Sequence, residues 1–413
     1  MATPRRRIGI VGYGTGGQAS ALALIQAGHE VEVFERVPDP GPAGAGFLLQ
    51  PTGLQALWRL GLMVRACTLG ARISRLHGET RGGRAVMDMR YADLDPLLHG
   101  VGLQRGALFE LLHAAIDGRA ELHADTAIVE VDCERGRLRD APGRWHGPFD
   151  AVVVADGSAS NLRQAVSPTR LDRPYPWGAL WCLVPEGDWA WRDELRQRYA
   201  LARRMAGMLP VGRAPGDPTR KLGFFWSLPV ARFDAWTREG PGAWLRELEA
   251  LWPEARERLG DRFDPATLAR AAYRDAIPRQ WWRGRALLLG DAAHAMSPQL
   301  GQGANMALLD AVSLADALER HASLPDAFAA HATERRRHLA AYHRCSRWLT
   351  PLFQSGQDAL ARVRDIAFLP FGRLPLARGH MLRVLSGTQQ GWLGRYRLQP
   401  GFVDALRNMP PMG

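Results

Sequence analysis

The 413-residue sequence predicts an α/β fold: a parallel sheet flanked by helices, an inserted mixed β-sheet, and a helical C-terminal segment. Three observations support this prediction. A strand–turn–helix–strand pattern opens the chain, an apolar strand followed by glycines and a helix lies near residue 290, and strand-like segments fill the interval between them. The length suffices for two domains that share a large core.

The first pattern combines an apolar strand at 8–11, a helix of small residues at 19–27 and a second strand at 31–34. Between the first strand and the helix, Gly12, Gly14 and Gly17 have the G-x-G-x-x-G spacing. These glycines permit a tight turn, close approach of the backbone to a pyrophosphate, and close packing of helix on strand.

The N-terminus of that helix offers free N–H groups and the positive end of the helix dipole to phosphates. Glu35 ends the second strand, 23 residues after Gly12, where a carboxylate can accept hydrogen bonds from the ribose hydroxyls of an adenosine. A glycine-rich turn without a ligand is the alternative. The complete unit favours a dinucleotide site, although it does not distinguish FAD from NAD.

The second pattern lies in "LLLGDAAHAMSPQLGQGANMALLDA", residues 287–311. An apolar strand at 285–289 leads to Asp291, and Gly301 and Gly303 precede a helix predicted for 305–318. A carboxylate at the carboxyl edge of a parallel sheet can bind a polyol, and a helix N-terminus can face the N1–C2=O edge of a reduced flavin. Alternatively, Asp291 only caps a helix. Together with the distant adenosine-type unit, the pattern favours FAD.

Three fingerprints follow in order: "GYGTGG" at 12–17, "ADGSASNLR" at 155–163 and "GDAAHAMSPQLGQGAN" at 290–305. With them the chain resembles, over roughly residues 5–345, the group A flavoprotein monooxygenases of the para-hydroxybenzoate hydroxylase type. The resemblance implies a Rossmann-like FAD-binding domain of the GR2 type and non-covalent FAD. It also implies NADPH or NADH as a transient reductant and a flavin C4a-hydroperoxide that transfers one oxygen atom from O2 to the substrate.

The resemblance also implies cofactor-binding roles for individual positions. These are Gly12, Gly14, Gly17, Glu35, Arg36, Arg105, Asp156, Gly157, Asp291, Gly301, Gly303 and Asn305. Arg36 would lie beside the adenosine, and Arg105 would contact FAD from the head of a helix unless it is an ordinary helix-start arginine. Asp156 could instead, or in addition, cap the next helix. Pro298 matches a proline near the flavin face.

The same resemblance divides the chain into alternating pieces. FAD-binding parts are expected at 1–71, 98–172 and 275–345, a hairpin of the substrate domain at 72–97, the substrate-binding sheet at 173–274, and helices at 346–413.

The interval between the FAD motifs contains predicted strands within 72–89, 175–185 and 221–230, and an amphipathic helix at 241–260. This sheet is expected to cover the flavin, and the substrate pocket is expected between the sheet and residues 296–300. Candidate wall residues are Trp177, Trp181, Phe224 and Trp226. Packing in the core of the sheet is an equally good interpretation of these aromatic side chains.

No acid–base pair is predicted to be catalytic, since the cofactor carries the chemistry and the protein orients the substrate and excludes water. For His294 we expect a packing or loop-fixing role. Helices predicted at 331–353, 358–372 and 375–387 could cover the flavin domain, form a dimer contact or lean on a membrane, and we favour the first.

The composition excludes several classes of protein. The formal charge of +11 comes almost entirely from scattered arginines, since Lys221 is the only lysine, so nucleic-acid binding is not expected. The four cysteines form no C-x-x-C pair, which argues against a zinc site or a disulfide scaffold. No stretch approaches the roughly 20 apolar residues of a membrane span, and we expect a soluble, cytoplasmic protein.

The sequence therefore predicts an FAD-dependent monooxygenase that uses NAD(P)H and O2 to hydroxylate an aromatic or electron-rich small molecule. The main alternative is an FAD-dependent reductase or dehydrogenase on the same fold, which would not insert oxygen. A flavin-binding protein without enzymatic activity is a third possibility. A flavin halogenase is disfavoured because the chain lacks the W-x-W-x-I-P pattern.

Overall fold

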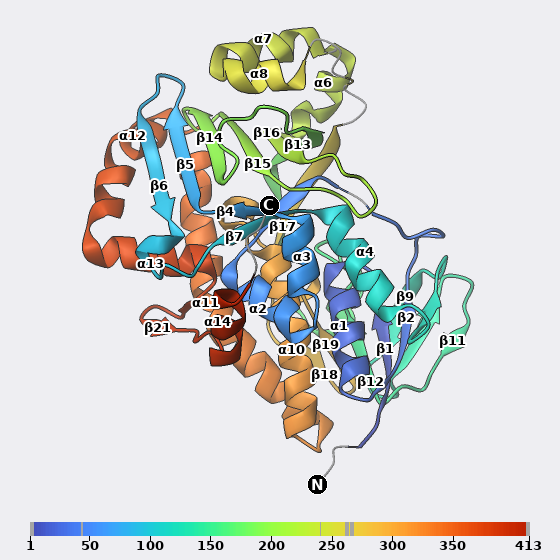
Figure 1. The fold of residues 1–413 in the computed structure, drawn as a ribbon. Coiled ribbons are helices and arrows are strands. Elements are labelled where there is room, and N and C mark those ends of the chain that lie inside the picture. The colour runs from blue at the N-terminus through green and yellow to red at the C-terminus, as the bar shows by residue number, and fades with distance from the viewer. Residues whose placement is uncertain (1–3, 43, 240, 261–263, 265–267, 410–413) are drawn as a thin grey trace.

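The computed structural model describes residues 4–42, 44–239, 241–260, 264 and 268–409. Two sheets organise this part of the chain, and helices cover both of them (Figure 1). The predicted α/β class, the inserted mixed sheet and the helical C-terminal region are confirmed.

The first sheet has the strand order β18-β19-β12-β1-β2-β8 in the described residues. Its members are β1 (Arg7–Val11), β2 (Glu30–Phe34), β8 (Glu121–His123), β12 (Ala151–Val154), β18 (Trp282–Arg283) and β19 (Ala286–Leu288). All neighbouring pairs are parallel except β18 with β19. The central strands are buried along almost their whole length, as expected for parallel strands covered on both faces.

Helix α1 (Thr15–Gln26) packs between α4 (Arg105–Ile116) and α10 (Gly303–Arg320) on this sheet (Figure 1). The elements that complete this half of the molecule are α2 (Pro51–Arg59), α3 (Met63–Leu69), α5 (Arg163–Val166), the sheet β3-β7-β4 (Gly46–Leu49, Gly100–Gln104, Ala71–Ile73) and the sheet β11-β10-β9 (Trp145–His146, Arg137–Asp140, Ile128–Asp132). The predicted strand–turn–helix–strand unit is present, with α1 starting four residues earlier than expected.

The second sheet has the order β17-β13-β16-β15-β14-β5-β6 in the part of the chain that the structure describes. Its strands are β5 (Arg75–Thr80), β6 (Ala85–Arg90), β13 (Thr169–Pro185), β14 (Glu194–Ala200), β15 (Arg204–Pro210), β16 (Lys221–Pro229) and β17 (Ala269–Pro278). Among these described strands, only β14 and β5 pair in parallel. The hairpin β5–β6 comes from the first hundred residues, so distant segments of the chain build one sheet.

One face of the second sheet is covered by α6 (Phe233–Glu239), α7 (Pro241–Leu251) and α8 (Pro253–Leu259), at the top of Figure 1. The predicted single helix at 241–260 is therefore wrong, because Pro253 begins a new helix and Trp252 has backbone angles outside the helical region. A proline at the first helical position is well tolerated, whereas within a helix it removes a hydrogen bond. The aromatic core beneath these helices includes Trp226, Trp244 and Trp252.

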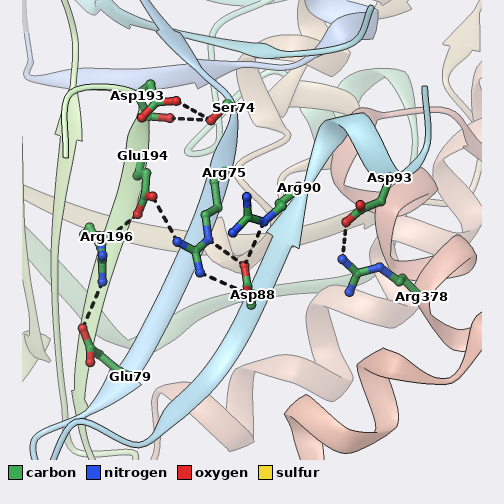
Figure 2. Close-up of polar contacts among 10 residues, drawn as sticks. All are labelled: Ser74, Arg75, Glu79, Asp88, Arg90, Asp93, Asp193, Glu194, Arg196 and Arg378. Atoms are coloured by element: carbon green, nitrogen blue, oxygen red, sulfur yellow. Dashed lines mark hydrogen bonds and ion pairs between the residues drawn. The ribbon is translucent and has the colours of Figure 1, made fainter. Parts of the chain in front are cut away.

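The outer edge of the second sheet is held by ion pairs between neighbouring strands (Figure 2). Arg75 on β5 contacts Asp88 on β6 at 2.7 Å and Glu194 on β14 at 3.1 Å. Arg378 forms an ion pair with Asp93, which lies in the short helix η1 (Tyr91–Asp93) just after β6. These pairs connect β14, the hairpin and the C-terminal helices into one unit.

The C-terminal region consists of α11 (Leu324–Phe353), α12 (Asp358–Arg373), α13 (Pro375–Ser386), the short strands β20 (Gln389–Gln390) and β21 (Gly394–Arg395), and α14 (Pro400–Arg407). Helices α12 and α13 form the left edge of the molecule in Figure 1, next to β5 and β6. Within the described residues, no helix combines the length and apolarity that crossing a bilayer requires.

Candidate active site

The turn after β1 has the geometry of a phosphate-binding loop. Gly12 has φ +100, and a Cβ on it would lie 2.5 Å from the carbonyl oxygen of Ala155. A Cβ on Gly17 would lie 1.9 Å from the carbonyl oxygen of Gly12, so helix and strand touch there. Gly14, in contrast, has no atom within 4 Å of its Cβ position. The first and third glycines are thus required by packing, and the middle one faces open space.

Open space beside Gly14 lies at the N-terminus of α1, where no side chain caps the helix. First-turn N–H groups without an intrahelical partner attract an anion. An approaching pyrophosphate would therefore meet bare backbone and free N–H groups, so this turn fits the diphosphate of FAD.

Glu35 lies at the end of β2, beside the same turn. Its carboxylate accepts hydrogen bonds from the backbone N–H groups of Tyr13 at 2.8 Å and Val37 at 3.0 Å. These bonds fix the carboxylate at the sheet edge, and each oxygen keeps a further lone pair for a ribose hydroxyl. The neighbouring Arg36 is exposed. Both residues fit the adenosine end of a dinucleotide.

Asp291 follows β19 as the first residue of the short helix α9 (Asp291–His294). Its side chain is exposed, and a Cβ on Gly303 would lie 3.7 Å from Asp291 Oδ1. The carboxylate therefore lies near the N-terminus of α10, which has no side-chain cap. Gly301 adopts the left-handed conformation with φ +61 just before that helix. This combination leaves a carboxylate and free N–H groups at one place, as a ribityl chain and a flavin pyrimidine ring require.

Asn305 lies in the first turn of α10, and its side-chain amide is hydrogen-bonded within the protein. It is fully buried, its Oδ1 accepts from the N–H of Gln50 at 2.8 Å, and its Nδ2 donates to the carbonyl oxygens of Leu48 at 3.0 Å and Gly301 at 3.1 Å. The side-chain amide is thus used to tie the end of β3 to the loop before α10. Asn305 can thus shape the loop at the N-terminus of α10.

Asp156 and Gly157 follow β12, between the two previous turns. Asp156 Oδ1 is buried without a hydrogen-bond partner among the described residues, and burial raises the pKa of Asp156. Ser160, and not Asp156, receives the backbone N–H of Arg163 at the start of α5, at 3.0 Å. The oxygen without a partner is what a ligand with hydroxyl groups would satisfy.

Arg163 is a site residue that the sequence reasoning missed, although it ends the quoted "ADGSASNLR" fingerprint. Only 1% of it is exposed. Its guanidinium donates to the carbonyl oxygens of Ser158 at 2.8 Å, Ala292 at 2.7 Å and Asp291 at 3.2 Å. It also pairs with Asp172 at 3.2 Å. One buried arginine therefore fixes the loop after β12 against the loop after β19.

A second buried network lies behind the Asp291 turn. Asp310 on α10 accepts from the N–H of Gly290 at 3.0 Å and contacts His294 Nε2 at 2.5 Å. Its other oxygen accepts from Arg335 Nε at 2.6 Å. Burial by itself would raise the pKa of Asp310, but His294 and Arg335 hold it well below its usual range. The loop-fixing role expected for His294 agrees with this geometry.

Arg335 also contacts His338 Nδ1 at 2.6 Å, and His338 Nε2 lies 2.8 Å from the carbonyl oxygen of Gly387. Burial lowers the pKa of His338 to about 3, so a neutral ring donates through Nε2 and accepts through Nδ1. The network thus runs from the Asp291 turn through α10 and α11 to the segment after α13.

Arg105 begins α4 and is exposed, with its guanidinium 5.9 Å from the ring centre of Phe47.

Pro298 lies in the loop that connects the first sheet to α10. It starts the short helix η4 (Pro298–Leu300), which packs against α11. Close by, the N–H of Ala276 on β17 bonds to the carbonyl oxygen of Ala295 at 3.0 Å. The second sheet is therefore attached directly to the loop that precedes Pro298.

The predicted aromatic wall needs a correction, because its residues lie on opposite faces of the second sheet. Phe224 and Trp226 are buried under α7, where both ring systems contact Trp244. Trp181 lies on the other face, 4.9 Å from the ring centre of Phe225, and its indole N–H donates to the Tyr273 hydroxyl at 3.2 Å. Trp177 is half-buried on β13. For Phe224 and Trp226 the core interpretation holds.

Comparison with known proteins agrees with this geometry. Residues 5–343 match the family described as "FAD binding domain". The chain is 31% identical over 362 residues to kynurenine 3-monooxygenase of Salinispora arenicola, covering 82% of this chain and 78% of that protein. It is 29% identical over 399 residues to 3-amino-4-hydroxybenzoate 2-monooxygenase of Streptomyces cremeus, covering 87% and 90%.

A solved structure of Klebsiella pneumoniae HpxO with FAD and uric acid shares the fold, with a TM-score of 0.77, 22% identity, and coverage of 94% of this chain and 98% of that one. The chain belongs to the FAD binding domain family and is a group A FAD-dependent monooxygenase of the para-hydroxybenzoate hydroxylase type.

Proposed function

We propose that this monooxygenase uses NAD(P)H and O2 to hydroxylate a flat aromatic small molecule, with FAD lying across the carboxyl edge of the first sheet. The observation that carries the proposal is the strand order β19-β12-β1-β2. It places the turns bearing Asp291, Asp156, Gly14 and Glu35 side by side at one edge, where open α/β sheets bind ligands.

The residues at this edge support an assignment of FAD along it. Glu35 and Arg36 would hold the adenosine, and the Gly14 turn with the N-terminus of α1 would hold the pyrophosphate. Arg105 would contact FAD from the start of α4. FAD supplies the redox chemistry when bound. The chain's own groups position it and shield it from water.

The other end of the cofactor is assigned in the same way. Asp291 would bind the ribityl hydroxyls, and Asp156 Oδ1 offers a further acceptor next to the Gly157 turn. Gly301 and Gly303 let the backbone approach the pyrimidine ring at the N-terminus of α10. Pro298 would lie near the flavin face.

For the substrate we propose the face of the second sheet that carries Trp181, Phe225 and Tyr273. An aromatic face of this kind suits a flat apolar ring. Because Tyr273 accepts the indole N–H of Trp181, its own O–H remains available to donate to a polar group of the substrate. The names of the two relatives, kynurenine and aminohydroxybenzoate monooxygenase, support an aromatic substrate. The substrate domain would then comprise 72–97 and 173–274.

The function is tested with purified, FAD-loaded protein, NADPH or NADH, and a set of phenols, quinolones and polyketide-like aromatics. A true substrate accelerates NAD(P)H oxidation, consumes O2 in proportion, and yields a product one oxygen atom heavier by mass spectrometry. Stimulated NAD(P)H oxidation without O2 uptake, with a reduced product instead, would contradict oxygen insertion and favour a reductase.

Asp291→Ala is expected to weaken FAD binding by roughly 10- to 100-fold, because hydrogen bonds to a charged group contribute about 1.5–3 kcal/mol. The fold should survive, since the carboxylate is exposed. Titration of apoprotein with FAD, followed by flavin fluorescence, measures the effect. Asp326→Ala is the matched control, because Asp326 is also an exposed acid in the first turn of a helix. An unchanged FAD affinity in Asp291→Ala would disprove the ribityl assignment.

A further inference from the structure

Exposed large hydrophobic side chains are unevenly distributed over the described surface. Those in the first half of the chain are single and dispersed: Val37, Val64, Val129 and Trp145. All the others lie between residues 348 and 393. Six of these belong to α12 and α13 and the turn that joins them, and we call them the C-terminal apolar surface: Leu360, Val363, Ile366, Phe371, Leu374 and Leu376. Dispersed apolar residues need no explanation, whereas a cluster of them marks an interaction site.

The outward orientation of these side chains is fixed by the packing of α12. Its inner side is closed by Ala361 and Arg364, which are 0% and 2% exposed. The Arg364 guanidinium lies 4.8 Å from the Tyr199 ring centre and donates to the carbonyl oxygens of Leu352 and Leu201. Val363 and Ile366, three residues apart on the opposite side, are 61% and 64% exposed.

Helix α13 is held in the same way. Arg378 pairs with Asp93 of η1, as Figure 2 shows, while Leu376 near the start of the helix is 90% exposed. The apolar side chains therefore face outward from two anchored helices, at the left edge of Figure 1.

The chain segment that carries this surface is rich in arginine, although Arg347 and Arg378 pair with Asp275 and Asp93 outside it. Residues 344–397 contain nine arginines against two aspartates and neither lysine nor glutamate, a formal charge of +7 out of +11 for the whole chain. Both aspartates form ion pairs, Asp358 with Arg203 and Asp365 with Arg364. Arg362 and Arg373 are exposed beside Ile366, four residues before and seven after it, and form no ion pair within the described residues.

This combination distinguishes between possible occupants. A second copy of the chain would bring two surfaces of the same positive charge together, which opposes association. An anionic lipid surface offers both an apolar layer for the exposed side chains and negative headgroups for the arginines. We propose that the C-terminal apolar surface docks on anionic phospholipid membranes, with α12 and α13 lying in the plane of the headgroups.

The test uses the FAD-loaded protein and large unilamellar vesicles of phosphatidylcholine with phosphatidylglycerol, compared with vesicles of phosphatidylcholine alone. Cosedimentation should show binding to the anionic vesicles that weakens as salt rises, since screening acts on exposed charges. The variant Val363→Gln/Ile366→Gln should bind roughly tenfold more weakly or worse, because two apolar anchors are lost. Arg362→Gln/Arg373→Gln should lower binding to anionic vesicles only.

The matched controls are Val64→Gln/Val129→Gln, whose valines are 56% and 52% exposed, and Arg65→Gln/Arg119→Gln, which removes two exposed arginines on α3 and just after α4. Both should bind as the parent does, and all variants should keep their FAD content. The proposal is overturned if the parent ignores anionic vesicles, or if the Val363/Ile366 variant binds them undiminished. A third outcome also overturns it: in sedimentation velocity without lipid the parent is a dimer and the Val363/Ile366 variant a monomer, and neither protein binds vesicles.

Discussion

Asp310→Asn is expected to lower the free energy of unfolding by about 3–5 kcal/mol, because removing one partner of a buried ion pair leaves the other charge uncompensated. Arg335, only 1% exposed, is that other charge. The same substitution weakens the hold on Gly290 and His294, so FAD affinity should fall as well. Urea unfolding followed by circular dichroism measures the first effect, and flavin fluorescence the second.

Asp316→Asn provides the comparison for this prediction. Asp316 lies on the same helix and pairs with Arg59 at 2.6 Å, but both side chains are about a third exposed. Exposed pairs contribute about 0–1 kcal/mol, so this variant should unfold almost as the parent does. If Asp310→Asn does not fold, the double variant Asp310→Asn/Arg335→Gln should recover part of the stability by removing the stranded charge. Equal stability of Asp310→Asn and Asp316→Asn would rule out a structural role for the buried pair.

Gly17→Ala is expected to lower the stability of the protein, whereas Gly14→Ala is expected to lower its affinity for FAD. A Cβ added to Gly17 would lie 1.9 Å from a backbone oxygen, so the first variant should lose about 3 kcal/mol of stability or more. Gly14 has no atom near its Cβ position, so apoprotein stability should change by less than about 0.5 kcal/mol in Gly14→Ala. The added methyl group would instead meet the pyrophosphate, and a loss of about 1.4 kcal/mol corresponds to tenfold weaker FAD binding.

Thermal unfolding of the apoproteins and FAD titration together separate the two effects. Gly82→Ala serves as control, since only Thr80 Oγ1, at 3.9 Å, lies near its Cβ position and it is remote from the sheet edge. Unchanged FAD affinity in Gly14→Ala would contradict the assignment of the FAD diphosphate to this turn. A stable Gly17→Ala protein would show that α1 can move away from β1 without cost.

The sequence predicted well those elements whose structure depends on residues close together in the chain. The β1–α1–β2 unit follows from glycine spacing and an acid at the strand end, and the turn at Asp291 follows from an apolar strand, glycines and a helix in succession. Pro253 indicates the start of a new helix, and the prediction of one helix at 241–260 did not take this into account. Strand β14 was not predicted, because arginines alternate through "ELRQRYA" and obscure the apolar pattern. Strand β15, "RMAGMLP", was not predicted either.

What the sequence could not provide depends on contacts between distant segments. Arg163 and Arg335 act through carbonyl and carboxylate partners on other elements, and no spacing along the chain encodes these pairs. Period-two alternation separates the faces of β16, but it does not say which face meets α7. The sequence therefore left open whether Phe224 and Trp226 line a pocket or pack in the core, and the structure places them against Trp244 of α7. Phe225, between them, lies on the side of Trp181.

The parallel pairing of β14 with β5 has a consequence for engineering this enzyme. Because β5 and β6 precede β7 in the chain, excising residues 169–278 as a cassette would leave β14 with an unpaired border and Arg196 without Glu79. Exposed strand borders invite aggregation. In a relative that receives this stretch, β14 would pair with the recipient's own hairpin, so preserving the pair between Arg196 and Glu79 requires that the hairpin at 75–90 be transferred as well.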